Sequence, residues 1–112
     1  MKAIIKRFHE TNGEDGDNGR SLFLFYATHL VHTPLQIPQA VLDKFAHIDG
    51  EERRLMRAMA FYLDLLVGEI ADTLKQYGMW EDTLLVFHSD NGGQIVDGGG
   101  SNNYPLRTLI ER

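Results

Sequence analysis

Two short runs of apolar and aromatic residues constrain the fold of this chain most strongly. They are SLFLFYAT, residues Ser21–Thr28, and TLLVFH, residues Thr83–His88. Each run is too short for a typical helix and is nearly all apolar, so each predicts a β-strand buried on both faces. Between them, apolar residues recur every three or four positions over Glu51–Tyr77 and stop at Gly78, which predicts one long α-helix.

The order strand, helix, strand predicts an α/β fold containing a β-α-β unit with parallel strands and a right-handed connection. In such sheets, ligands bind beyond the carboxyl ends of the strands. His29 and His32 follow the first predicted strand, and Ser89, Asp90 and Asn91 follow the second. We therefore expect these polar side chains to converge at one edge of the sheet.

The other segments carry weaker signals. Lys2–Glu10 has the apolar spacing of a short amphipathic helix, and Pro38 at a first helical position predicts a short helix through Phe45. Thr11–Arg20 is rich in Gly, Asn and Asp and has no apolar residue to bury, so it predicts a surface loop. The alternating Asp15 and Asp17 suggest a calcium loop instead, but the spacing lacks the glutamate of an EF-hand. Val96–Asn103 is glycine-rich without the lysine of a phosphate-binding loop and predicts a mobile loop.

Composition excludes several classes of function. The 112 residues are 43% hydrophobic and 24% charged, as in one globular domain with a packed core. The net charge of −5 and the absence of a Lys/Arg cluster give no basis for a nucleic-acid partner. No window approaches the roughly 20 apolar residues of a membrane span, and the first residues are too polar for a signal peptide. Without cysteine the chain has no disulfide, thiolate zinc site or cysteine nucleophile.

Asp90 and Asn91 are the candidate metal ligands. A carboxylate and an amide carbonyl are hard oxygen donors that suit Ca²⁺ or Mg²⁺, and Gly92 and Gly93 let the backbone approach a ligand closely. Two oxygens are fewer than the six to eight ligands, roughly, that Ca²⁺ takes. Spacing alone favours the alternative, a turn in which Asp90 and Asn91 cap neighbouring amides.

His32 is the candidate anion-binding residue. The following Thr33-Pro34 stiffens the chain, so the imidazole could be aimed at an anion or a leaving group, although a loop histidine is more often a surface residue. His29 keeps that surface interpretation. His88, Ser89 and Asp90 have the residue types of a catalytic triad, but adjacent strand residues point to opposite faces, which excludes the triad.

Taken together, the segments resemble the sulfatases, especially the animal-type arylsulfatase B-like branch. The resemblance covers about Leu22 to Arg107, from SLFLFYATHLVHTPLQIPQAVLDKF to GMWEDTLLVFHSDNGGQIVDGGGSNNYPLR. It implies an alkaline-phosphatase-like sheet and a formylglycine nucleophile, made in a Cys/Ser-x-Pro-x-Arg motif, that attacks sulfur while Ca²⁺ polarises the sulfate. It also implies that Asp90 and Asn91 are two of the calcium ligands and that His32 contacts the sulfate group.

The chain departs from that family pattern at its nucleophile. It has no cysteine, and none of Ser21, Ser89 and Ser101 has a proline two places later, so the formylglycine precursor is absent and no catalytic residue is assigned. The family's first-strand aspartate pair would lie before Met1, and its active-site lysine segment does not follow YPLR. We expect residues 1–112 to be a fragment of a sulfatase N-terminal catalytic domain, related to enzymes that hydrolyse aryl or sugar sulfate esters and inactive alone.

Two alternatives remain open. The chain could be a non-catalytic sulfatase-like fragment or pseudoenzyme that binds a divalent ion weakly and associates with the missing sulfatase segments or a full-length relative. It could also fail to fold stably alone, because strands buried on both faces need sheet neighbours. The resemblance further implies a secretory or lysosomal parent protein.

Overall fold

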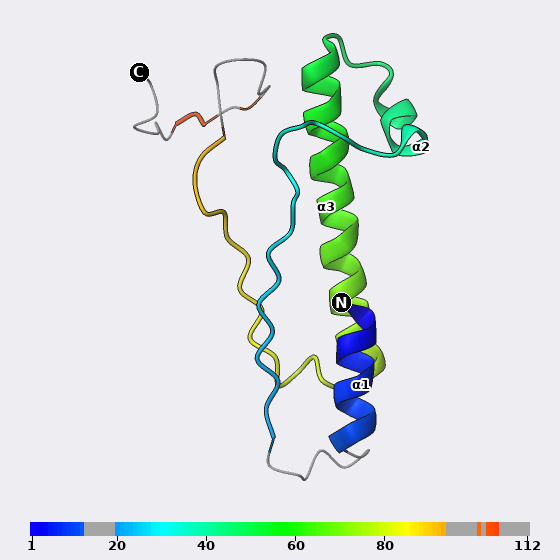
Figure 1. Ribbon diagram of the computed structural model, residues 1–112, viewed down its shortest axis with the longest axis vertical. Coiled ribbons are helices and arrows are strands. Elements are labelled where there is room, and N and C mark those ends of the chain that lie inside the picture. Colours follow the sequence, from blue (N-terminus) through cyan, green and yellow to red (C-terminus); the bar gives the residue numbers. More distant parts are fainter. Residues whose placement is uncertain (13–19, 94–100, 102, 106–112) are drawn as a thin grey trace. The chain divides into compact units, whose positions relative to one another are not determined.

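The structure is a computed structural model that describes residues 1–12, 20–93, 101 and 103–105. Its helical elements are α1 (Lys2–Asn12), α2 (Gln39–Leu42), the 3₁₀ turn η1 (Asp43–Phe45) and α3 (Glu51–Gln76), as Figure 1 shows. The chain forms two compact units, Met1–Thr28 with Asp64–Leu85, and His29–Leu63 with Val86–Arg112. No described helix is long and apolar enough to cross a membrane.

The long helix α3 forms and ends as its sequence predicts. Glu51 and Glu52 place negative charge in its first turn, at the positive end of the helix dipole, and so stabilise the helix. At the other end Gly78 adopts a φ of 65°. Its amide donates to the Lys75 carbonyl at 3.0 Å, and the Met79 amide donates to the Leu74 carbonyl at 2.9 Å. This pair of bonds is the Schellman motif, which satisfies carbonyls that the helix end leaves without a partner.

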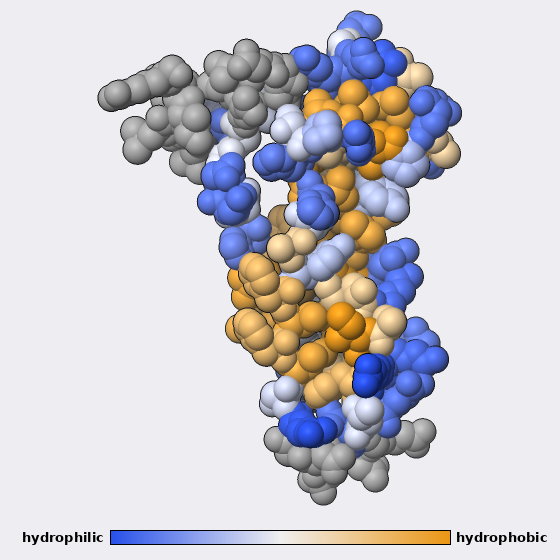
Figure 2. Space-filling model, in the orientation of Figure 1, coloured by the Kyte–Doolittle hydropathy of each residue, from blue (hydrophilic) through white to orange (hydrophobic). Residues whose placement is uncertain are grey.

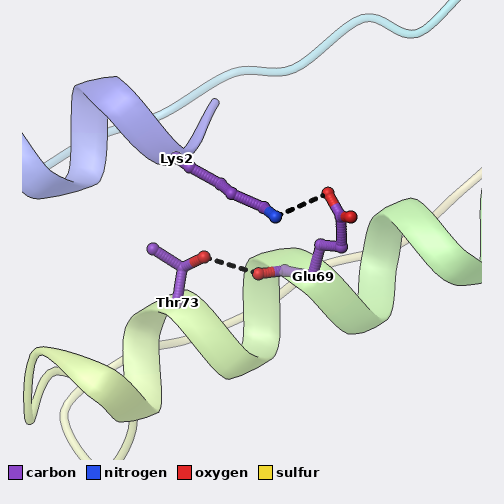
Figure 3. Close-up of polar contacts among 3 residues, drawn as sticks. All are labelled: Lys2, Glu69 and Thr73. Atoms are coloured by element: carbon purple, nitrogen blue, oxygen red, sulfur yellow. Dashed lines mark hydrogen bonds and ion pairs between the residues drawn. The ribbon is translucent and has the colours of Figure 1, made fainter.

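In the first unit, α1 packs against the C-terminal half of α3. Ile5 is fully buried. The His9 and Tyr77 rings lie 4.9 Å apart, and Lys2 Nζ lies 3.1 Å from Glu69 Oε2 (Figure 3). Both charged side chains are more than half exposed, so the ion pair contributes about 1 kcal/mol at most, less than the roughly 1.5–3 kcal/mol from burying an isoleucine. Apolar burial therefore holds α1 in place.

The helix predicted from Lys2 is confirmed, but it is longer than predicted. It continues through Thr11 and Asn12, which the sequence assigned to a surface loop, and Asn12 is buried. The Thr11 hydroxyl donates to the Arg7 carbonyl at 2.9 Å, which lets this polar residue stay within the helix. Most of the predicted loop, including the aspartates weighed as an EF-hand, lies outside the described residues.

In the second unit, the segment after Pro38 folds back onto α3. The predicted short helix to Phe45 is confirmed in outline, with Pro38 preceding its first turn and the chain tightening into η1. The Phe45 ring meets the Phe61 ring of α3 edge to face, with centroids 5.6 Å apart. Arg54 Nε donates to the Ile48 carbonyl at 3.2 Å. The Phe45–Phe61 ring contact and the buried side chain of Met59 supply the apolar packing of the unit.

The predicted strands are not observed. Residues 20–29 and 83–89 have no regular secondary structure, and the structure contains no strand among the residues it describes. Phe23 is 90% exposed, Phe25 75% and Leu84 88%, and Figure 2 shows apolar side chains on the surface. An extended chain becomes a strand only when a neighbour bonds its amides and carbonyls in a regular ladder, and the described residues show no such ladder at residues 20–29 and 83–89. The predicted burial of these two runs is therefore wrong for this chain, and the predicted β-α-β unit is not confirmed among the described residues.

The predicted mobile loop at Val96–Asn103 falls mainly outside the described residues. Only Ser101 and Asn103 of this segment are described. Asn103 contacts the loop that carries Asp90 and Asn91.

We predict that alanine substitutions at two glycines of this helix region act in opposite directions. Gly78→Ala should destabilise α3 by about 1 kcal/mol, because a Cβ disfavours the positive φ there. Gly68→Ala should stabilise it by about 0.5–1 kcal/mol, since an added Cβ at Gly68 meets no atom within 4 Å and alanine favours a helix interior. Urea titration followed by far-UV circular dichroism measures both changes. Shifts of the same sign would contradict this account of the helix end.

We also predict that the exposed extended segments make the chain self-associate. Large uncovered apolar surface drives association, so replacing Phe23 and Phe25 together with glutamine should shift the population toward monomer. Sedimentation velocity measures the species present. Leu65→Gln is the control, because Leu65 is an exposed apolar residue of α3 outside these segments and its loss should change association little. A wild-type chain that is monomeric at micromolar concentration would disprove this.

Candidate functional site

The loop after the second apolar run is organised by its own side chains. Ser89 Oγ donates to the Asn91 carbonyl at 2.6 Å, and Asn91 Nδ2 donates to the Gly92 carbonyl at 2.6 Å. Ser89, Asp90 and Asn91 are all exposed. The chain bends at Asp90 and Asn91, which is compatible with the turn that spacing alone favours. However, this bend is closed by side-chain donors bonding to carbonyls, not by Asp90 and Asn91 oxygens capping amides.

This arrangement bears directly on metal binding. Asn91 Nδ2 donates to the Gly92 carbonyl, so the side-chain amide points its oxygen away from Gly92. That oxygen is the atom that can bind a cation. Among the described residues, none donates a hydrogen bond to the Asp90 carboxylate. The loop therefore offers two hard oxygen donors of the type that suits Ca²⁺.

The side chain of Asn103, which is not predicted from the sequence as a site residue, binds the backbone of this loop. Asn103 Oδ1 accepts from the Gly93 amide at 2.8 Å, and Asn103 Nδ2 donates to the Gly93 carbonyl at 2.7 Å. From the sequence, Asn103 is predicted only to lie in a glycine-rich loop. No periodic pattern marks a contact between one side chain and a backbone ten positions away.

His32 is exposed in an irregular segment of the second unit. Its Nδ1 lies 2.7 Å from the Thr33 carbonyl, so Nδ1 acts as the donor of that bond and Nε2 faces away from it. The peptide bonds Leu30–Val31 and Thr33–Pro34 are cis. His29 is exposed as well, in agreement with its surface interpretation.

His32, Asp90 and Asn91 belong to the same compact unit. No hydrogen bond or ion pair joins His32 to the other two among the described residues. Nor do the described His, Asp and Glu residues form any group of three or more that could hold a metal ion. Their convergence at one site therefore stays a prediction.

A separate shallow hollow lies in the first unit. It is lined by Lys75, Gly78, Trp80 and Glu81, with Lys75 Nζ 5.2 Å from the centroid of the Trp80 ring. Lys75 also lies 3.9 Å from Asp72. The hollow contains none of the predicted site residues.

Comparison with known proteins identifies the family. A family model described as Sulfatase matches residues 2–110. Arylsulfatase J of Mus musculus is 37% identical over 91 residues, covering 81% of this chain and 15% of that protein. An N-acetylgalactosamine-6-O-sulfatase of Bacteroides thetaiotaomicron is 37% identical over 76 residues, covering 68% of this chain and 14% of that protein. Arylsulfatase A of Homo sapiens is 30% identical over 88 residues, covering 79% of this chain and 16% of that protein.

The chain belongs to the sulfatase family, which confirms the resemblance in its sequence. It spans 14–16% of the length of these three relatives. The family has an alkaline-phosphatase-like α/β fold, whereas the described part of this chain has helices and extended segments only. No solved structure matches the chain.

Proposed function

We propose that this chain is part of a sulfatase catalytic domain and supplies two calcium ligands and one sulfate-binding histidine to the hydrolysis of aryl or sugar sulfate esters. The observation that supports this most directly is the Ser89–Gly93 turn. Within a family match over residues 2–110, this turn exposes the Asp90 carboxylate and orients the Asn91 amide with its nitrogen engaged. A bound Ca²⁺ would polarise the sulfate group as a Lewis acid.

Each of the proposed residues has a separate task. Asp90 provides the negative charge that attracts the cation, and Asn91 adds a neutral oxygen. His32 donates to the Thr33 carbonyl through Nδ1, so the imidazolium form has Nε2–H left to donate to a sulfate oxygen. Asp90 and Asn91 would hold the cation, and His32 would bind the ester's anionic group.

The chain does not carry the nucleophile of its family. Its 112 residues contain no cysteine and no serine with the proline and arginine that follow in the formylglycine motif. We propose that hydrolysis requires the remaining sulfatase segments or a full-length relative as partner. By family, the parent protein would act in the secretory pathway or the lysosome.

A second candidate function is a non-catalytic, sulfatase-like polypeptide that binds a divalent ion weakly. It is favoured by one observation, that the described residues contain no group of three or more His, Asp and Glu able to hold a metal. The two functions can be distinguished by adding the missing catalytic segments. Only the first function predicts that the chain then takes part in turnover.

We predict weak calcium binding that depends on Asp90. Two protein oxygens leave most of the coordination shell to water, so the Kd should be about 10⁻³ M or weaker. Asp90→Asn should abolish the binding, whereas Asp82→Asn, which removes the same charge from another exposed aspartate, should leave it unchanged. Isothermal titration calorimetry measures the affinity. Submicromolar binding would show that a complete site exists and contradict the proposal.

We further predict no turnover of a chromogenic aryl sulfate by the purified chain. The attacking group is absent from its sequence, and the calcium ligands alone only polarise a substrate. The assay should follow the released phenol at saturating Ca²⁺, with Asp90→Asn as the matched blank. Activity that exceeds that of the Asp90→Asn variant and is proportional to chain concentration would disprove the account of the missing nucleophile.

A further inference from the structure

The Asn103 side chain binds both polar backbone groups of one residue, Gly93. It accepts from the Gly93 amide at 2.8 Å and donates to the Gly93 carbonyl at 2.7 Å. This exchange of two bonds resembles a hydrogen-bonded pair in an antiparallel ladder, with the side-chain amide in place of the second backbone. Because both bonds come from one planar group, they fix the orientation of Gly93 as well as its position.

The absence of a side chain at Gly93 is a second requirement of the same contact. A Cβ placed there would lie 2.5 Å from both Cβ and Oγ of Ser101. Carbon atoms in favourable contact are about 3.5–4.0 Å apart, so any other residue would push Ser101 away. Asn103 therefore binds the backbone of Gly93, and Ser101 occupies the space in which a side chain at position 93 would lie.

The two bonds from Asn103 form a clamp on Gly93, which closely follows the candidate calcium ligands Asp90 and Asn91 in the chain. Ser89 donates to the Asn91 carbonyl, Asn91 donates to the Gly92 carbonyl, and Asn103 then holds Gly93. Glycines have the greatest backbone freedom, so Gly92 and Gly93 would not by themselves keep the preceding residues in one orientation. The bonds from Asn103 supply that restraint from outside the loop.

We propose that Asn103 is a positioning residue for the Asp90–Asn91 cation site: by clamping Gly93 it fixes the turn that aims the two oxygen donors. Asn103 does not itself bind the cation. This inference rests on the calcium function proposed above for the loop. It predicts that the order of the turn and its calcium affinity both depend on Asn103.

The test compares Asn103→Ala with Gln39→Ala in the full 112-residue chain. Gln39→Ala is the matched control, because it removes a 2.7 Å side-chain bond to Asp43 in the same unit. In the metal-free chain, the heteronuclear ¹⁵N NOE of Asn91 should fall in Asn103→Ala and not in Gln39→Ala. Far-UV circular dichroism should show equal helix content in both variants.

A second measurement follows the backbone amide chemical shifts of Asp90 and Asn91 while calcium is titrated into each variant. Losing two hydrogen bonds of ordinary strength should weaken the affinity about tenfold in Asn103→Ala. If the wild-type chain shows no calcium-dependent shifts, the proposed calcium function fails, while a fall in the NOE still supports the clamp. If Asn103→Ala changes neither the NOE nor the affinity, the positioning role is overturned and the calcium function stands.

A rescue experiment separates the clamp from a general loss of structure. Gly93→Ala should lower the Asn91 NOE, because its Cβ would collide with Ser101. Adding Ser101→Gly removes the two atoms that the new Cβ would approach to 2.5 Å and leaves only the ordinary contact with Asn103 Oδ1 at 3.7 Å, so the double variant should recover most of the wild-type NOE. Ser101→Gly alone controls for the loss of the serine. A double variant no better than Gly93→Ala would contradict the close packing that the proposal assumes.

Discussion

Backbone hydrogen bonding decides which parts of this chain take regular structure. A helix bonds each of its interior amides to a carbonyl of its own segment, so α3 can form from the sequence Glu51–Gln76 alone. An extended segment has no such internal partner and becomes a strand only beside another strand. Among the described residues, the apolar runs at residues 21–28 and 83–88 are not paired as strands. These runs remain extended and exposed, although their composition is that of the most buried strands of an α/β sheet.

The same distinction explains what the sequence could predict. The α1 and α3 helices and the stop at Gly78 follow from local signals, namely apolar spacing and a glycine able to adopt positive φ. Family membership was also predictable, since it depends on the order of segments and not on their packing. Strand formation was not, because it depends on a neighbouring chain segment. The extension of α1 to Asn12 was missed because composition alone suggested a loop there.

The candidate site, too, was only partly predictable from the sequence. Residue types identified Asp90 and Asn91 as suitable oxygen donors, but only the structure shows the Asn91 nitrogen engaged by Gly92. The clamp by Asn103 was not predictable, because it joins a side chain to a backbone ten positions away. For His32 the structure adds its bond to Thr33, and its approach to the two oxygen donors remains a prediction.

Amide hydrogen–deuterium exchange tests the central claim most directly, because it reports whether each backbone amide has a lasting partner. The account predicts that the amides of Phe23, Phe25 and Leu84 exchange at nearly the rate of an unstructured peptide, while those of Met59 and Leu74 in α3 exchange far more slowly. If the extended segments of the monomeric chain were as protected as α3, they would be paired as strands and the account would be contradicted.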